Sequence, residues 1–166
     1  FQDYRDVNER FDRIVSIGIL EHVGPKNYKT FMEVVERNLA DDGLYLLHTI
    51  GTNTRALSVD PWTDKYIFPG GVLPVLQQID AVTEGVFILE DLHNIGTHYD
   101  PTLMAWMANV DKHRQELENL GYDERFYRMW RYYLLGAAGS DRARRNQLWQ
   151  IVYSKKGLDG GYQSIR

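Results

Sequence analysis

The chain alternates between short apolar runs and stretches in which apolar residues recur every three or four positions. Continuous apolar runs of about four to eight residues, bounded by glycine or polar residues, are typical of strands buried on both faces of a parallel sheet. We predict strands at residues 13–17, 44–50, 86–89 and 148–153, the last with a more alternating pattern.

Helical spacing of apolar residues fills the first gap between these strands. The segment 28–39 repeats its apolar residues at three and four positions, and the acidic and glycine residues 41–43 are predicted to end that helix. Residues 52–71 are too rich in proline and glycine for a single regular element. We predict a structured loop there, followed by a short helix around 72–79.

Two amphipathic helices are predicted between the third and fourth strands. The first uses Asp100 as its N-cap, Pro101 as its first residue and Gly121 as its C-terminal stop. The second starts at Asp123 and carries an apolar face through Ala137. The alternation of strands and helices along the chain indicates an α/β sheet with right-handed crossovers.

Composition narrows the class of protein. A length of 166 residues suits one domain with a sizeable core, and a net charge of −4 argues against a general nucleic-acid binder. No apolar stretch reaches the roughly 20 residues of a membrane-spanning helix, and the opening residues lack a secretory signal pattern. The lack of cysteine excludes disulfides and thiolate metal sites and fits a cytoplasmic protein.

Polar groups gather where the predicted strands end. Ligands of open α/β sheets bind beyond the carboxyl ends of the strands, and segments 18–24, 48–51 and 90–100 reach that edge. If the first two strands are neighbours, Glu21 and His48 lie together, a carboxylate and an imidazole suited to proton transfer or to holding an anion. The acid, imidazole and phenol groups of these segments are Glu21, His22, His48, Glu90, Asp91, His93, His98 and Tyr99.

Simpler interpretations of these residues stay open at this point. Glu21 can belong to a turn or a helix start, and His48 can be a core histidine bonded to a neighbouring carbonyl. The five-residue spacing of His93 and His98 matches no standard helical pair of metal ligands. A glycine-rich nucleotide loop between a strand and a helix is missing, and residues 157–161 lack a following helix.

Several long motifs in register identify a family. The motifs are FDRIVSIG at 11–18, EHVGPKNY at 21–28, LLHTIG at 46–51, DPW at 60–62, KYIFP at 65–69, TLMAW at 102–106 and QLWQ at 147–150. Together they resemble the C-terminal half of cyclopropane-fatty-acyl-phospholipid synthases, bacterial enzymes that depend on S-adenosylmethionine. The resemblance implies the C-terminal half of a Rossmann-like methyltransferase fold, with strands four to seven and the last strand antiparallel.

The same resemblance implies a reaction. In this family, a methylene group passes from S-adenosylmethionine to the cis double bond of a phospholipid acyl chain, through a carbocation that a bound bicarbonate deprotonates. The matching catalytic positions are Glu21, His48, Ile50 through its backbone, and Tyr99. His48 and the N–H of Ile50 would donate to the anion, Tyr99 would donate and stabilise positive charge, and Glu21 would accept from bicarbonate and orient it.

The cofactor positions implied by the resemblance are Tyr4 and Arg5, near the adenine, and Ser16, Ile17 and Gly18, near the methionine portion. We expect residues 1–166 to form the C-terminal part of a catalytic domain whose N-terminal part, with the glycine-rich cofactor loop, lies upstream. This chain alone should then lack synthase activity and bind the cofactor negligibly. Its exposed sheet edge should favour association, including a homodimer.

The expected partners are phospholipid acyl chains at the membrane surface, with no nucleic acid, and the expected location is cytoplasmic, peripheral to the inner face of the membrane. Two alternatives stay open. One is a related lipid methyltransferase that gives a methyl-branched, methylene or hydroxylated product. The other is a half-domain that binds lipid or a partner without catalysis.

Overall fold

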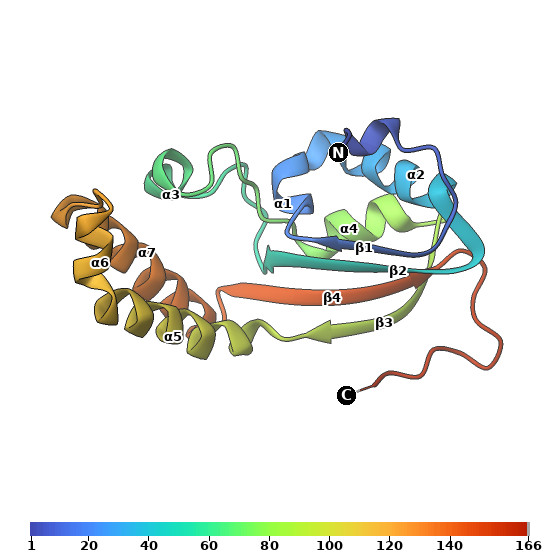
Figure 1. Ribbon diagram of the computed structural model, residues 1–166. Helices are drawn as coiled ribbons and strands as arrows, with labels where there is room; N and C mark the ends of the chain where they lie inside the picture. Colours follow the sequence, from blue (N-terminus) through green and yellow to red (C-terminus); the bar gives the residue numbers. More distant parts are fainter. Residues whose placement is uncertain (166) are drawn as a thin grey trace.

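A mixed sheet forms the centre of the computed structural model, which describes residues 1–165 (Figure 1). Its strands in the described chain are β1 (Phe11–Ile17), β2 (Leu39–Thr52), β3 (Ile88–Asn94) and β4 (Asn146–Ser154), in the order β1-β2-β4-β3. The strands β1 and β2 are parallel, whereas β4 is antiparallel to both β2 and β3. This arrangement confirms the predicted α/β fold with an antiparallel last strand.

One face of the sheet is covered by helices. The elements α1 (Leu20–Val23), α2 (Tyr28–Asn38) and α4 (Leu76–Thr83) lie on this face, together with the short 3₁₀ turns η1 (Tyr4–Asp6) and η2 (Pro25–Asn27) (Figure 1). The main core forms beneath them from apolar residues of α1, α2, α4, β2 and β4, among them Leu20, Met32, Leu47, Ile79 and Ile151. Alternation along β1 points Ser16 toward these helices and leaves Val15 and Ile17 exposed on the opposite face.

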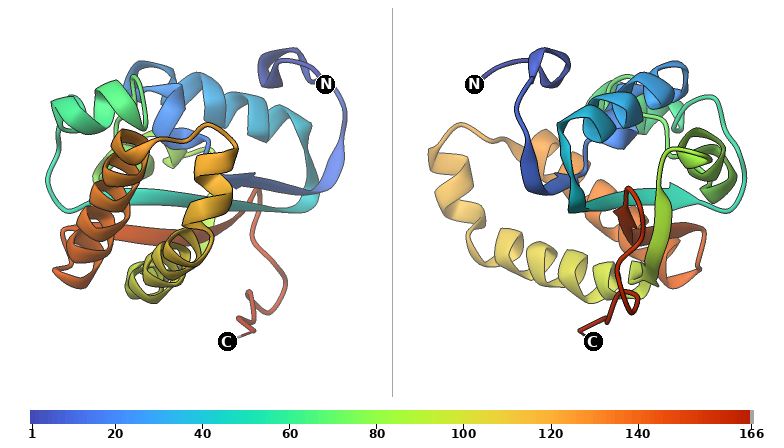
Figure 2. Two further views of the ribbon diagram at one scale, coloured as in Figure 1. Left: turned by 60° about the vertical axis from the view of Figure 1, so that its left-hand side comes forward. Right: turned by 90° about the vertical axis from the view of Figure 1, so that its right-hand side faces the viewer.

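A second helical unit stands beyond the end of the sheet. It contains η3 (Gly96–His98), α5 (Tyr99–Lys112), α6 (Arg114–Asn119) and α7 (Glu124–Arg142), and Figure 2 shows α5 and α7 side by side. The two long helices share a small core of Leu103, Met107, Leu134 and Ala138. Within residues 1–165, no helix combines the length and the apolar character needed to cross a membrane.

The predicted end of the first long helix at residues 41–43 is wrong. The helix α2 ends at Asn38, and the chain enters β2 directly at Leu39, which is fully buried in the core. The register between β1 and β2 shifts between Phe11, which pairs with Leu39, and Arg13, which pairs with Leu44. Residues 39–43 therefore form an irregular start of β2. Asp41 is stabilised there by Arg10 and Lys156, at 2.7 and 2.9 Å.

The predicted single helix from Asp100 to Gly121 is also wrong in part. The chain breaks at His113 between α5 and α6, and Asp100 lies in the first turn of α5 rather than capping it. Its carboxylate pairs with Arg142 of α7 at 2.8 Å, so a tertiary contact replaces the expected local cap. Gly121 does end α6, with a φ of +94° that suits glycine.

Other boundaries differ by a few residues. The region predicted as a loop contains α3 (Pro61–Tyr66), which starts where Asp60 accepts hydrogen bonds from the backbone of Trp62 and Thr63. The helix predicted at 72–79 lies instead at Leu76–Thr83. Asp123 caps α7 as predicted, accepting from the Phe126 N–H at 2.8 Å.

Candidate active site

A sharp turn after β1 carries Glu21 to the edge of the sheet. Gly18 ends β1 with a φ of +65°, and its N–H donates to the carbonyl of His48 on β2 at 3.0 Å. The short helix α1 begins two residues later, and the carbonyl of Glu21 accepts from the Val72 N–H at 2.9 Å. These backbone bonds fix Glu21 beside the end of β2.

The two carboxylate oxygens of Glu21 have different surroundings. The side chain is 6% exposed, and Oε1 accepts a 2.6 Å hydrogen bond from the backbone N–H of Ile50. Oε2 is buried and has no hydrogen-bond partner within the described residues. Burial, together with the charge of Glu21, raises the pKa of the nearby Tyr28 hydroxyl to about 12. Because a buried acceptor without a donor is costly, the free oxygen of Glu21 marks a place for a donor group of a ligand.

His48 lies two residues before Ile50 on β2, in the register position opposite Gln150 of β4. Its Nδ1 lies 3.3 Å from Nε2 of Gln150, so the structure shows a side-chain partner rather than the carbonyl of a core histidine. Burial lowers the pKa of His48, and the charge of Glu21 opposes that shift. The imidazole is therefore mostly neutral at pH 7, with one nitrogen able to donate.

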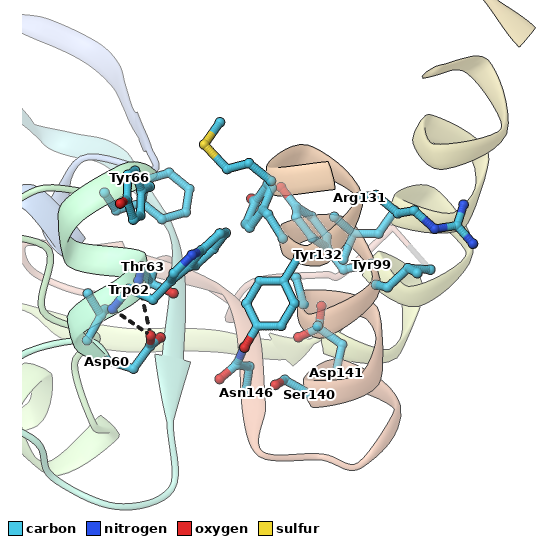
Figure 3. Close-up of a pocket in the computed structure, with 18 of the residues that line it drawn as sticks. Asp60, Trp62, Thr63, Tyr66, Tyr99, Arg131, Tyr132, Ser140, Asp141 and Asn146 are labelled. Carbon is cyan, nitrogen blue, oxygen red and sulfur yellow. Dashed lines mark hydrogen bonds between the residues drawn. The ribbon is translucent and has the colours of Figure 1, made fainter. Parts of the chain in front are cut away.

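A large open cavity lies between the sheet edge and the second helical unit. It has a volume of about 1700 Å³ and includes Ile50 at the end of β2 and Tyr99 at the start of α5. Its walls are aromatic: Trp62 of α3 meets Tyr132 of α7 edge-on, with ring centroids 4.6 Å apart (Figure 3). Pockets of this size exceed the usual range of small-ligand sites.

The structure brings together three of the four predicted catalytic positions. Glu21 bonds Ile50 directly and perturbs His48, whereas Tyr99 shares the cavity with Ile50 and rests edge-on against Trp106 at 6.3 Å. Glu21 and His48 do not line that cavity. Ile50 is thus the residue that links the carboxylate to the aromatic cavity.

The predicted cofactor residues form two groups. Tyr4 packs edge-on against Phe31 of α2 at 5.3 Å, and Arg5 pairs with Asp3 at 2.7 Å. The second group, Ser16 to Gly18, lies at the C-terminal end of β1. The Ser16 hydroxyl is buried without a hydrogen-bond partner in residues 1–165, and Ile17 and Gly18 are exposed. The end of β1 is open at Gly18, where an added Cβ would meet no atom within 4 Å.

Two other candidates from the sequence, Glu90 and Asp91, lie away from this edge. The strand β3 extends to Asn94, so Glu90 and Asp91 lie within it rather than beyond it. Glu90 accepts from the Ser154 hydroxyl at 2.5 Å, at the end of the sheet opposite Ile50. Across the described chain, no group of three or more His, Cys, Asp or Glu could hold a metal ion.

Sequence reasoning missed one buried acid of the cavity. Asp141 of α7 is 6% exposed, and burial, followed by the charge of Asp100, raises its pKa to about 6. A signal was present, because Asp141 continues the buried stripe of Leu134 and Ala138 at helical spacing. A carboxyl group on an apolar stripe is unusual enough to mark it in advance.

The sheet order and the reversed last strand match solved structures of S-adenosylmethionine-dependent methyltransferases and are consistent with the C-terminal half of that fold. The cyclopropane synthase MmaA2 from Mycobacterium tuberculosis matches 92% of this chain over 58% of its own, at a TM-score of 0.84 and 29% identity. The mycolic acid cyclopropane synthase CmaA1, complexed with SAH and CTAB, gives the same coverages and identity, at a TM-score of 0.83.

Sequence comparison identifies the family. The model of the mycolic acid cyclopropane synthetase family matches residues 1–151. The cyclopropane-fatty-acyl-phospholipid synthase of Escherichia coli K12 is 53% identical over 165 residues, which are 99% of this chain and 43% of that protein. The chain belongs to the mycolic acid cyclopropane synthetase family, and it spans less than half the length of this curated relative.

Proposed function

We propose that the protein carrying this chain is a cyclopropane-fatty-acyl-phospholipid synthase. It would transfer a methylene group from S-adenosylmethionine to the cis double bond of a phospholipid acyl chain. The 53% identity to the Escherichia coli synthase supports this assignment. The observation that carries it is the buried Glu21, which accepts from the N–H of Ile50, a residue that lines the cavity, through one oxygen and keeps its other oxygen unpaired within the described residues.

The donor and acceptor groups around Glu21 fit a bicarbonate ion. The unpaired Oε2 can accept from the hydroxyl of bicarbonate, and a neutral His48 can donate to one of its oxygens. The N–H of Ile50 already donates to Glu21, so the anion would have to share or displace that bond. Tyr99, in the same cavity as Ile50, would supply a further donor.

The residues at the start of the chain fit part of a cofactor site. The ring of Tyr4 and the guanidinium of Arg5 would lie against the adenine, and Ser16 to Gly18 would approach the methionine portion. When bound, S-adenosylmethionine supplies the electrophilic methyl group and bicarbonate supplies the base. The aromatic walls of the cavity would exclude water from the reacting carbon and stabilise positive charge there.

The substrate and location follow from the same proposal. Phospholipid acyl chains would enter the cavity from the inner face of a membrane, to which a cytoplasmic enzyme binds peripherally. A chain that spans 43% of its relative would work together with further residues of the complete enzyme.

Expression of the full-length gene product in a bacterial host without cyclopropane lipids tests the proposal. Mass spectrometry should show that unsaturated phospholipid chains gain one methylene and lose their double bond. A methyl-branched or hydroxylated product would identify the related lipid methyltransferase instead. Unchanged lipids, with soluble protein present, would overturn the assignment as an enzyme of this class.

A further inference from the structure

The mouth of the aromatic cavity carries positive charge from two elements. Arg125 and Arg128 both line the cavity and are exposed on α7, and their spacing of three residues places them on the same side of the helix. On α3, Lys65 does not line the cavity itself, but its ammonium group lies 5.0 Å from the centre of the ring of Tyr66, which does. Two guanidinium groups and one ammonium group therefore lie near aromatic residues of the cavity, and Lys65 and Arg125 interact with Tyr66.

Three acidic residues that line the cavity already have hydrogen-bond or ion-pair partners. Asp60 caps α3 through the N–H groups of Trp62 and Thr63, at 3.1 and 3.0 Å. Asp123 caps α7, and Glu124 pairs with Arg114 of α6. No acidic partner of Arg128 is found among the described residues.

A phenol between these cations responds to their charge. Lys65 and, to a smaller extent, Arg125 lower the pKa of the Tyr66 hydroxyl. Lys65 and Arg125 thus interact with a phenol oxygen on this side of the cavity. Arg131, one turn further along α7, is different, because it is directed away from Trp62 and Tyr66 and pairs with Asp111 at 3.6 Å (Figure 3).

We infer that Arg125 and Arg128 form a binding site for the phosphate diester of a phospholipid headgroup, at the mouth of the cavity that takes the acyl chain. Arginine suits this role because its planar group bonds two phosphate oxygens at once. Trp62 and Tyr132 line the same cavity as the two arginines, so one lipid would place its phosphate on α7 and its apolar chain against these rings. This inference rests on the proposed function, since it assigns the headgroup end of the proposed substrate.

Binding of soluble short-chain lipids to the full-length gene product tests the site without requiring turnover. The probes are dihexanoylphosphatidylglycerol, which carries the phosphate diester, dihexanoylglycerol, which lacks it, and inorganic phosphate. In calorimetry, Arg128→Gln should weaken binding of the phosphate-bearing lipid about tenfold and leave binding of the neutral lipid unchanged. Arg128→Lys should retain part of the affinity and guards against a variant that fails to fold.

A matched control is Lys29→Gln, which removes the same charge from an exposed residue of α2. If this control weakens binding as much as Arg128→Gln does, general electrostatics explain the effect and the site is refuted. If the unaltered protein binds inorganic phosphate as tightly as it binds the phosphate-bearing lipid, the ligand of the site is free phosphate and the headgroup proposal is refuted. Equal affinity of Arg128→Gln and the unaltered protein for that lipid would also overturn the inference.

The proposed function and this site can fail separately. A protein that binds the lipid through Arg128 but adds no methylene refutes the reaction alone. A protein that adds methylene with an unchanged KM for phospholipid in Arg128→Gln refutes the headgroup site alone.

Discussion

Replacing Glu21 by glutamine separates the structural role of this side chain from its chemical role. The amide oxygen of glutamine can still accept from the Ile50 N–H, which donates to Glu21 at 2.6 Å. The second position changes from an unpaired carboxylate oxygen to an amide nitrogen, which donates instead of accepting. The packing volume is almost unchanged, so the variant removes charge and acceptor capacity without opening a cavity.

The expected magnitudes differ strongly between stability and turnover. A hydrogen bond to a charged group contributes roughly 1.5–3 kcal/mol and a neutral one roughly 0.5–1.5 kcal/mol, so Glu21→Gln should lower the unfolding free energy by about 1 kcal/mol. Loss of a positioned acid–base partner lowers rates by roughly 10²–10⁴-fold. We therefore expect kcat to fall at least about 100-fold while the melting temperature falls by only a few degrees.

The assay uses the full-length gene product with S-adenosylmethionine and unsaturated phospholipid vesicles. Turnover is followed through release of S-adenosylhomocysteine, cofactor affinity by calorimetry, and stability by thermal unfolding. A fall in kcat below tenfold would refute the reasoning. Parallel losses of kcat and of cofactor affinity would instead assign Glu21 a structural role in the fold of the site.

Three further variants test the packing and the charges around the site. In denaturant titrations, Asp141→Asn should raise the unfolding free energy by roughly 1–2 kcal/mol at pH 8 and have no effect near pH 4. The pKa of Asp141 in the folded protein, about 6, exceeds the ordinary value of 3.8. Ionisation of Asp141 therefore destabilises the folded protein as the pH rises from about 4 through 6, and asparagine does not ionise. A gain that persists at pH 4 would contradict this cause. Gly51→Ala should destabilise the protein by roughly 1–3 kcal/mol, because an added Cβ would lie 2.0 Å from the Trp149 ring. Equal stability of this variant and the unaltered protein would show that the ring moves freely. His48→Asn should reduce the stability that the protein loses as the pH falls below about 6.5. The pKa of His48 is lowered in the folded protein, so protonation of this side chain favours the unfolded state. An unaltered dependence of stability on pH would exclude this contribution.

The sequence predicted most reliably those features that depend on local pattern. The four strands, the Asp123 cap of α7 and the Gly121 stop of α6 follow from apolar runs and from residues whose backbone preferences are strong. The Asp100 cap failed because Arg142, 42 residues away, takes its carboxylate. Such long-range competition leaves no trace in a local window of sequence.

The sequence predicted the part of the candidate site at the sheet edge but not the cavity. The expectation that Glu21 and His48 share one edge of the sheet followed from placing two parallel strands side by side, and the β1–β2 register confirms that these strands are neighbours. Ile50 entered the candidate site only through the family resemblance, and its hydrogen bond to Glu21 was not predicted. The cavity was not predictable, because its walls come from α3 and α7, which are about 70 residues apart in the chain. The α3 helix was missed although Asp60 and Pro61 are typical of a helix start.

The backbone of Ile50 connects these two parts of the molecule. Its N–H belongs to the sheet edge and donates to Glu21, and the residue also lines the cavity together with residues of α3, α5 and α7. An anion that displaces Oε1 of Glu21 from this N–H leaves Glu21 with two free acceptors in a buried place. Since unpaired buried acceptors are unfavourable, a bound anion is stabilised most if it brings its own donor to Glu21. Bicarbonate carries such a hydroxyl and nitrate does not, so the arrangement favours a protonated oxyanion over a simple one of equal charge.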